Sequence, residues 1–261
     1  MAPLPATDLP AAALGLLLVV GFVAGFVDAI AGGGGLLTVP ALLATGLPPH
    51  LVFGTNKGQA VWGSGAALFG FARAGLIDRA NAPIGFAAGF AGSLAGAALL
   101  LLIANEVLRP IVLVLLVIVA GFLAFRPPLR ATPSPVPLRW HTPVAITLAA
   151  GIGAYDGFFG PGTGTFLIIG YVLLLGHALT RATAEAKVVN FASNLAAFGL
   201  FAWRGNVVWS ISLPMAAAQL LGGYSGSQMA LRGGDRLIRW VVLAVVTALV
   251  LKLASDAWGG R

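Results

Sequence analysis

The 261-residue chain is 59% hydrophobic and only 9% charged, and its mean hydropathy is +0.96. About a quarter of a typical soluble domain is charged, so this composition excludes such a domain and indicates a helical protein that crosses a membrane repeatedly. The net charge of +7 is not gathered into a basic stripe, which argues against nucleic-acid binding. The absence of cysteine excludes disulfides and thiolate metal sites.

Apolar segments of nearly membrane-spanning length follow one another along the chain. In the first half we expect helical segments at residues 11–31, 35–47, 55–72, 82–103 and 106–125. Five prolines within residues 126–137 exclude a helix there and predict a linker. In the second half we expect segments at residues 142–159, 163–177, 184–203, 208–231 and 236–255. The chain then divides into a first repeat (1–126), a Pro-rich cytoplasmic linker (127–140) and a second repeat (141–261).

Two glycine-rich breaks stand in corresponding places of the two halves. Residues 32–35 begin four positions after Asp28, and residues 160–164 begin four positions after Asp156. Broken apolar segments in corresponding places of two halves point to the binding site of a transporter. Backbone groups freed at such a break must be satisfied by protein, water or ligand, because lipid cannot satisfy them.

The arginines indicate how the two halves are oriented, because cytoplasmic loops carry the excess of positive charge. If each half crosses the membrane an odd number of times, nine arginines lie on one side; with an even number they split almost evenly. We therefore predict an all-α polytopic membrane protein of two inverted repeats, with about five segments in each and Gly-broken helices at the centre. Both termini would be periplasmic. Full spans and a re-entrant hairpin both remain open for the first two segments of each half.

The breaks are candidate anion sites. Free N–H groups and the helix dipole at a helix N-terminus attract anions. The predicted substrate-binding residues at the breaks are Gly33, Gly34, Gly35, Gly162 and Thr163. The alternative is that these glycines only permit tight packing or a bend.

A lysine follows each break. A charge inside the membrane costs about 2.5–3.5 kcal/mol or more unless it is paired or hydrated. Lys187 shares one predicted helix face with Asn190 and Asn194, and we predict that this face binds substrate. In the first half the corresponding polar residues are Asn56, Lys57 and Gln59. The alternative is that each lysine begins a helix and extends to water, and for Lys57 this reading stays open.

Three carboxylates accompany these residues: Asp28, Asp156 and Glu185. They are predicted either to be counter-ions of the lysines or to carry protons in a coupled transporter. Capping of the broken helix ends is the alternative. No cluster of metal-ligating residues is seen in the sequence, so we predict neither a metal nor a cofactor.

These motifs resemble those of the sulfite exporter TauE/SafE family, also called the toluene sulfonate uptake permease family. The resemblance covers nearly the whole chain and is carried by residues 28–40, 47–50, 54–57, 157–164 and 184–194. It implies a multi-pass protein of the bacterial inner membrane that moves sulfite, sulfonates, sulfoacetate or related small anions. Glu185 departs from the pattern, which has a small hydroxyl residue or alanine before the lysine.

We therefore expect a secondary transporter, and from the resemblance an exporter, of small sulfur oxyanions or organosulfonates such as sulfite or sulfoacetate. It would work by alternating access. The expected partners are this small anionic substrate and the lipid bilayer, and coupling to protons or to sodium stays open. An anion channel is an alternative, although no charged ring or carbonyl filter stands out. A membrane-embedded enzyme is disfavoured, because the sequence offers neither a nucleophile–base pair nor a metal cluster.

Overall fold

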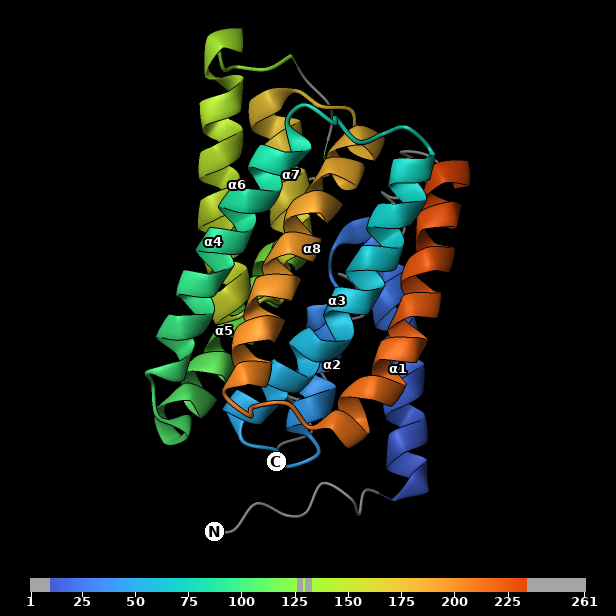
Figure 1. Cartoon of the computed structure of the whole chain (residues 1–261), viewed down its shortest axis with the longest axis vertical. Coiled ribbons are helices and arrows are strands. Elements are labelled where there is room, and N and C mark those ends of the chain that lie inside the picture. Colours follow the sequence, from blue (N-terminus) through green and yellow to red (C-terminus); the bar gives the residue numbers. More distant parts are fainter. Residues whose placement is uncertain (1–9, 126–128, 130–132, 234–261) are drawn as a thin grey trace.

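The computed structural model of the chain describes residues 10–125, 129 and 133–233. Over these residues the structure is helical and contains no strand (Figure 1). The helices of the first half are α1 (Ala11–Ala31), α2 (Gly35–Leu43), α3 (Pro49–Arg73), α4 (Ala82–Leu101) and α5 (Asn105–Phe125). Those of the second half are the 3-10 helix η1 (Leu138–Trp140), α6 (His141–Phe158), α7 (Thr163–Leu175), α8 (Leu179–Trp203) and a helix over residues 209–233.

Nine of the ten predicted segments coincide with helices, and the tenth, at residues 236–255, lies outside the described residues. The predicted starts of α3 and α8 were wrong, because these helices begin earlier, at Pro49 and Leu179. Proline is well suited to the first turn of a helix, where its missing N–H would be unpaired anyway. The polar residues at the start of α8 include good helix formers such as alanine and glutamate. Lys57 and Lys187 therefore each lie eight residues inside a helix instead of beginning one.

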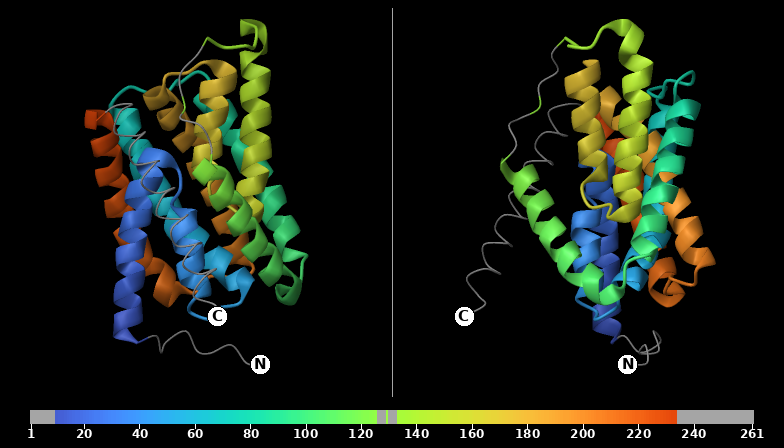
Figure 2. Two further views of the ribbon diagram at one scale, coloured as in Figure 1. Left: turned by 180° about the vertical axis from the view of Figure 1, so that it is seen from behind. Right: turned by 90° about the vertical axis from the view of Figure 1, so that its left-hand side faces the viewer.

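The two short helices form hairpins that enter the bundle from opposite ends (Figures 1 and 2). We call these the α2–α3 end and the α7–α8 end, after the turns that they hold. The α1–α2 hairpin enters from the α2–α3 end, the α6–α7 hairpin enters from the α7–α8 end, and their tips meet inside the bundle (Figure 2). Helices α3 and α8 run past the tips in opposite directions. This is the arrangement that inverted repeats predict, and the repeat relationship itself stays a prediction.

The described arginines are distributed unevenly between the two ends. The turn after α3, the helix η1, the start of α8 and the end of the 209–233 helix all lie at the α7–α8 end (Figure 1). They carry Arg73, Arg79, Arg139, Arg181 and Arg232. The opposite end holds Arg109 and Arg204.

Glycines spaced four residues apart hold two helix pairs in close contact. Helix α4 packs on α6, where Cβ atoms built on Gly92 and Gly96 would lie 2.1 and 1.9 Å from carbonyl oxygens of α6. The 209–233 helix packs on α1 in the same way, with Gly222 and Gly226 at 2.1 and 2.4 Å from α1 carbonyl oxygens. Only glycine permits such approach, and this four-residue spacing is typical of closely packed membrane helices. Each contact joins a fourth segment to the first segment of the other half.

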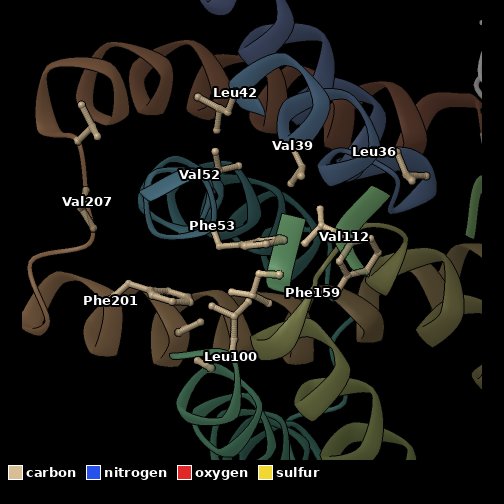
Figure 3. Close-up of a cluster of buried hydrophobic side chains, with 14 of the residues drawn as sticks. Leu36, Val39, Leu42, Val52, Phe53, Leu100, Val112, Phe159, Phe201 and Val207 are labelled. Atoms are coloured by element: carbon tan, nitrogen blue, oxygen red, sulfur yellow. The ribbon is translucent and has the colours of Figure 1, made fainter. Parts of the chain in front are cut away.

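Two apolar clusters separate the centre of the bundle from its two ends. The first lies toward the α2–α3 end and includes Val39 of α2, Phe53 of α3, Leu100 of α4 and Phe201 of α8 (Figure 3). The second lies toward the α7–α8 end and is built by α7, the start of α8 and the end of α3. The polar residues of α3 and α8 lie between these clusters.

The outer surface is itself apolar, with exposed leucine, valine and phenylalanine side chains on α1, α4 and α5. Within the described residues these three helices are long and apolar enough to cross a membrane. Helices α3 and α8 are longer, at 25 residues each, but less hydrophobic, because they carry the buried polar groups described next. An apolar surface around a polar centre is the reverse of a soluble protein and fits a lipid environment.

Candidate functional site

The two glycine-rich breaks lie against each other at the centre of the structure. A Cβ atom built on Gly32 would lie 2.2 Å from the carbonyl carbon of Gly164, so the two backbones touch. Gly32 also adopts a positive φ of 79°, which side chains disfavour. The Thr165 N–H donates to the Gly32 carbonyl oxygen at 3.3 Å, and the Thr165 hydroxyl donates to the Ala31 carbonyl oxygen at 2.7 Å. The second break therefore satisfies backbone groups that the first break frees.

Lys57 of α3 pairs with Asp156 of α6. The Lys57 Nζ lies 2.8 Å from the Asp156 Oδ2, and the two side chains are only 2% and 3% exposed. The same Nζ donates to the Asn194 Oδ1 at 3.0 Å. The hydroxyls of Ser193 and Thr163 lie 2.5 and 2.7 Å from the two Asp156 carboxylate oxygens. Thr163 is the first residue of α7, so the carboxylate lies where the helix dipole favours a negative charge.

Lys187 of α8 pairs with Asp28 of α1. The Lys187 Nζ lies 3.0 Å from the Asp28 Oδ2 and also donates to the Asp28 carbonyl oxygen. The Asn190 Nδ2 donates to the same carboxylate oxygen at 3.0 Å. The Lys187 side chain is fully buried, whereas 15% of the Asp28 side chain is exposed.

The two ion pairs are exchanged between the halves. The lysine on the third helix of each half pairs with the aspartate on the first helix of the other half. Both lysines are buried in the middle of their helices, so the alternative that they extend to water is wrong. Removing one partner of such a buried pair leaves an uncompensated charge and costs about 3–5 kcal/mol.

Amide side chains surround the pairs. On α8 the Asn194 Nδ2 donates to the Asn190 Oδ1 at 2.9 Å. On α3 the Asn56 Oδ1 accepts from the Thr38 hydroxyl of α2 at 2.5 Å and from the Gln59 Nε2 at 3.2 Å. The four predicted amides therefore lie on α3 and α8, and all of them are buried.

A small cavity lies among these groups, with a volume of about 20 Å³. That is room for about one water molecule, and too little for a sulfonate. Its walls come from α1, α2, α3, α6, α7, α8 and the 209–233 helix, and are formed by Asp28, Gly32, Gly35, Thr38, Asn56, Lys57, Ala60, Asp156, Gly160, Thr163, Gly164, Asn190, Asn194 and Gln219. Five of the predicted substrate-binding residues are not part of these walls, namely Gly33, Gly34, Gln59, Gly162 and Lys187. Of these, Lys187 reaches the cavity through its partner Asp28.

Sequence reasoning missed Gln219, which lies on the 209–233 helix and lines the cavity. It is 3% exposed, and no donor in the described part of the chain reaches its Oε1 or the Oε1 of Gln59. A buried amide oxygen without a donor calls for a water molecule or a ligand that can donate a hydrogen bond. The signal was present, because Gln219 is the one polar residue within residues 213–223, and an isolated polar residue inside a membrane helix usually faces the protein interior.

Glu185 lies away from this group. Its carboxylate oxygens lie 2.7 Å from the Arg181 Nε and 2.8 Å from the His177 Nδ1, at the α7–α8 end. Arg181 also reaches Asp78 at 3.5 Å, in the turn before α4. A hydrogen bond from Asn81 lowers the pKa of the Asp78 carboxyl. The prediction that Glu185 is a counter-ion of the lysines was therefore wrong, because it pairs with an arginine and a histidine at the surface.

A larger cavity of about 590 Å³ lies beside this surface network. Its walls combine Asp78, His177, Arg181 and Glu185 with apolar side chains of α4 and α6. The central cavity is smaller, but it is the one where broken helices, buried charges and unpartnered amides coincide. Because buried ionisable groups inside a membrane protein mark substrate and ion pathways, we place the functional site there.

Buried ion pairs beside two broken helices, within a bundle that is apolar outside, indicate a helical membrane transporter. Comparison with known proteins agrees. Residues 17–253 match the family described as sulfite exporter TauE/SafE, so the chain belongs to that family. Its membership confirms the resemblance drawn from the sequence motifs.

Curated relatives carry transporter names. The chain is 39% identical over 257 residues to the probable membrane transporter protein ORF9 of Sinorhizobium sp, covering 95% of each chain. It is 37% identical over 246 residues to the probable membrane transporter protein YfcA of Escherichia coli K12, covering 94% of this chain and 91% of that one. A probable membrane transporter protein of Haemophilus influenzae is 38% identical over 243 residues, with 93% and 95% covered. No solved structure matches the chain.

Proposed function

We propose that this protein is a secondary transporter of small anions, with sulfur oxyanions and organosulfonates such as sulfite and sulfoacetate as its substrates. The observation that carries the proposal is the pair of buried lysines, each held by an aspartate of the other half beside a broken helix. Lysines enclosed in a membrane protein supply the positive charge that an anion needs there. Export is the direction that the family description suggests.

The binding groups would come mainly from α8. Lys187, Asn190 and Asn194 lie on one face of that helix, and hydrogen bonds from charged donors are the stronger ones for an oxyanion. The amide N–H groups of Asn56 on α3 and of Gln219 on the 209–233 helix would complete the shell from the other side of the cavity. Planar amides and an ammonium group suit a tetrahedral or pyramidal oxyanion, because each can donate along a different direction.

Alternating access is favoured over a channel by the closure of the cavity. Its small volume and the apolar clusters on both sides leave no room for a permeating anion in this conformation. Transport would therefore require one set of helices to rock against the other around the central pairs. We propose that the protein lies in the bacterial inner membrane with its arginine-rich α7–α8 end in the cytoplasm, and therefore with the N-terminus in the periplasm.

Transport by purified protein in proteoliposomes tests the proposal. Sulfite, sulfoacetate, taurine, sulfate and chloride would each be supplied on one side, and accumulation on the other side followed over time. We expect at least one sulfur anion to be moved by the wild type and by Arg139→Ala, an exposed residue at the α7–α8 end, and not by Lys187→Ala. Equal transport by Lys187→Ala would show that the central lysine is not part of the pathway.

A further inference from the structure

The central site is electrically neutral before any substrate arrives. Among the described residues, the cavity is surrounded by Lys57 and Lys187 with Asp156 and Asp28, so two positive charges are balanced by two negative ones. An incoming monoanion would leave one negative charge in excess in a site closed off from water, and a dianion such as sulfate would leave two. Such an uncompensated buried charge is strongly unfavourable. A positive charge must therefore enter with the anion.

Asp28 is the group placed to take that charge. Both aspartates line the cavity, but 15% of the Asp28 side chain is exposed and only 3% of the Asp156 side chain. The Asp28 carboxylate accepts from two side-chain donors, Lys187 Nζ and Asn190 Nδ2, both on one oxygen. Asp156 has donors within 2.5–2.8 Å of both oxygens. Releasing the Asp28 carboxylate from its side-chain donors therefore breaks fewer hydrogen bonds than releasing that of Asp156.

The donors that hold Asp28 are also those expected to hold the substrate. An ammonium group and an amide N–H that bind one carboxylate oxygen are equally suited to an oxygen of a sulfonate or sulfite. Asp28 thus occupies the place of the substrate while the site is empty. The charged groups that face it are Lys187 on α8, Lys57 on α3 and Asp156 on α6, and the latter two neutralise each other.

We propose that Asp28 binds a proton when the anion binds, so that the protein transports an anion and a proton together. This inference rests on the proposed function. One O–H bond forms on the Asp28 carboxylate, with the proton taken from water. Lys187 keeps its own proton and transfers its hydrogen bond, with that of Asn190, from Asp28 to the anion. For a monoanion the charge of the site is unchanged, so the membrane potential would not drive this step.

Proton uptake on anion binding tests the inference in the wild-type protein. Purified full-length protein in weakly buffered detergent solution would be titrated with isethionate, sulfoacetate, sulfate or chloride while a pH-indicator dye is followed. We expect about one proton to be taken up per anion bound. Affinity should then fall by up to about tenfold for each unit of rise in pH over which a proton is taken up with the anion, by linkage.

Two variants sharpen the test. Asp28→Asn imitates the protonated acid, so it should bind the anion without proton uptake and with an affinity independent of pH. Asp78→Asn, in the turn before α4, should keep the proton uptake of the wild type. In the alternative, sodium enters with the anion in place of a proton and is held by the unpartnered oxygens of Gln59 and Gln219. Repeating the titration with choline in place of sodium tests this alternative.

The outcomes separate this inference from the proposed function. Anion binding without proton uptake, or binding that needs sodium, would overturn the inference and leave the proposed function intact. If none of the anions binds the folded wild-type protein, both fail together. Proton uptake that persists in Asp28→Asn would assign the proton to another group and also overturn the inference.

Discussion

The two central ion pairs use the same residue types at matching positions, yet their surroundings differ. In the Lys57–Asp156 pair, both carboxylate oxygens have donors, and both side chains are almost fully enclosed. In the Lys187–Asp28 pair, two donors share one carboxylate oxygen, and 15% of the Asp28 side chain is exposed. The first pair has the features of a fixed structural link between the halves. The second has those of an exchangeable one.

The difference arises from a few side chains on α3 and α8. Asn190 lies three residues after Lys187, where Ala60 lies three residues after Lys57. Ser193, six residues after Lys187, donates to Asp156 and so completes the other pair. The polar groups of α8 thus serve both pairs, while α3 contributes Asn56 and Gln59 on its own side. Small differences between the two halves can therefore give one pair a structural role and the other a binding role.

Breaking the enclosed Lys57–Asp156 pair should have the largest effect, which is a loss of stability. We expect Lys57→Ala to lower the free energy of unfolding by about 3–5 kcal/mol, because it leaves Asp156 buried without its counter-ion. The double variant Lys57→Ala/Asp156→Ala should be more stable than Lys57→Ala alone, since no unpaired charge remains. Thermal unfolding in detergent measures both. A Lys57→Ala protein as stable as the wild type would contradict the structural role of this pair.

Breaking the more exposed Lys187–Asp28 pair should affect anion binding more than folding. We expect Lys187→Ala to weaken anion binding about ten- to a hundredfold, since a hydrogen bond to a charged group is worth about 1.5–3 kcal/mol. Lys187→Arg should restore binding only in part, because a planar guanidinium differs in shape from an ammonium group. Calorimetric titration with the transported anion gives the affinities, and Arg139→Ala is the control. An unchanged affinity in a stable Lys187→Ala protein would remove this lysine from the binding site.

A smaller effect is expected at Gln219. Replacing it with leucine keeps a similar volume but removes the amide, so about one neutral hydrogen bond of 0.5–1.5 kcal/mol should be lost. Anion affinity should fall about two- to tenfold, while stability stays the same or rises because an unpartnered amide has been removed. Gln228→Leu, nine residues later on the same helix, is the matched control. Wild-type affinity in Gln219→Leu would mean that this amide binds water and not substrate.

The smallest effect is expected at Glu185, which lies outside both pairs. It is paired with a half-exposed arginine, and such surface pairs contribute about 0–1 kcal/mol. We expect Glu185→Gln to leave anion affinity within about twofold of the wild type. A larger loss in the same titration would extend the binding site to the α7–α8 end and its larger cavity.

Much of the fold could be predicted from the sequence, because apolar runs separated by glycine and proline are strong signals in membrane proteins. The starts of α3 and α8 could not be predicted, because a stretch of polar residues is typical of a loop even where, as here, those residues face a buried polar centre. That error also concealed the position of Glu185. Glu185 lies two residues before Lys187 on α8. This spacing is a rotation of about 200° around the helix axis, so the two side chains face opposite sides.

The four charged residues of the candidate site were predicted from the sequence, but which lysine pairs with which aspartate was not. Asp28, Asp156, Lys57 and Lys187 stood out as charges in apolar surroundings. Their exchange between the halves depends on how two hairpins meet, which local spacing does not encode. Gln219 was missed because a single amide carries no motif, although its isolation in an apolar helix was a usable signal.

The central claim is that the substrate anion takes the place of Asp28 beside Lys187. Selenite, a heavier analogue of sulfite, would locate the anion in crystals of the wild-type protein by the anomalous scattering of selenium. We expect an anomalous peak within hydrogen-bonding reach of the Lys187 Nζ and the Asn190 Nδ2, with the Asp28 side chain turned away and the Lys57–Asp156 pair intact. A peak elsewhere, with the Lys187–Asp28 pair unbroken, would contradict the claim.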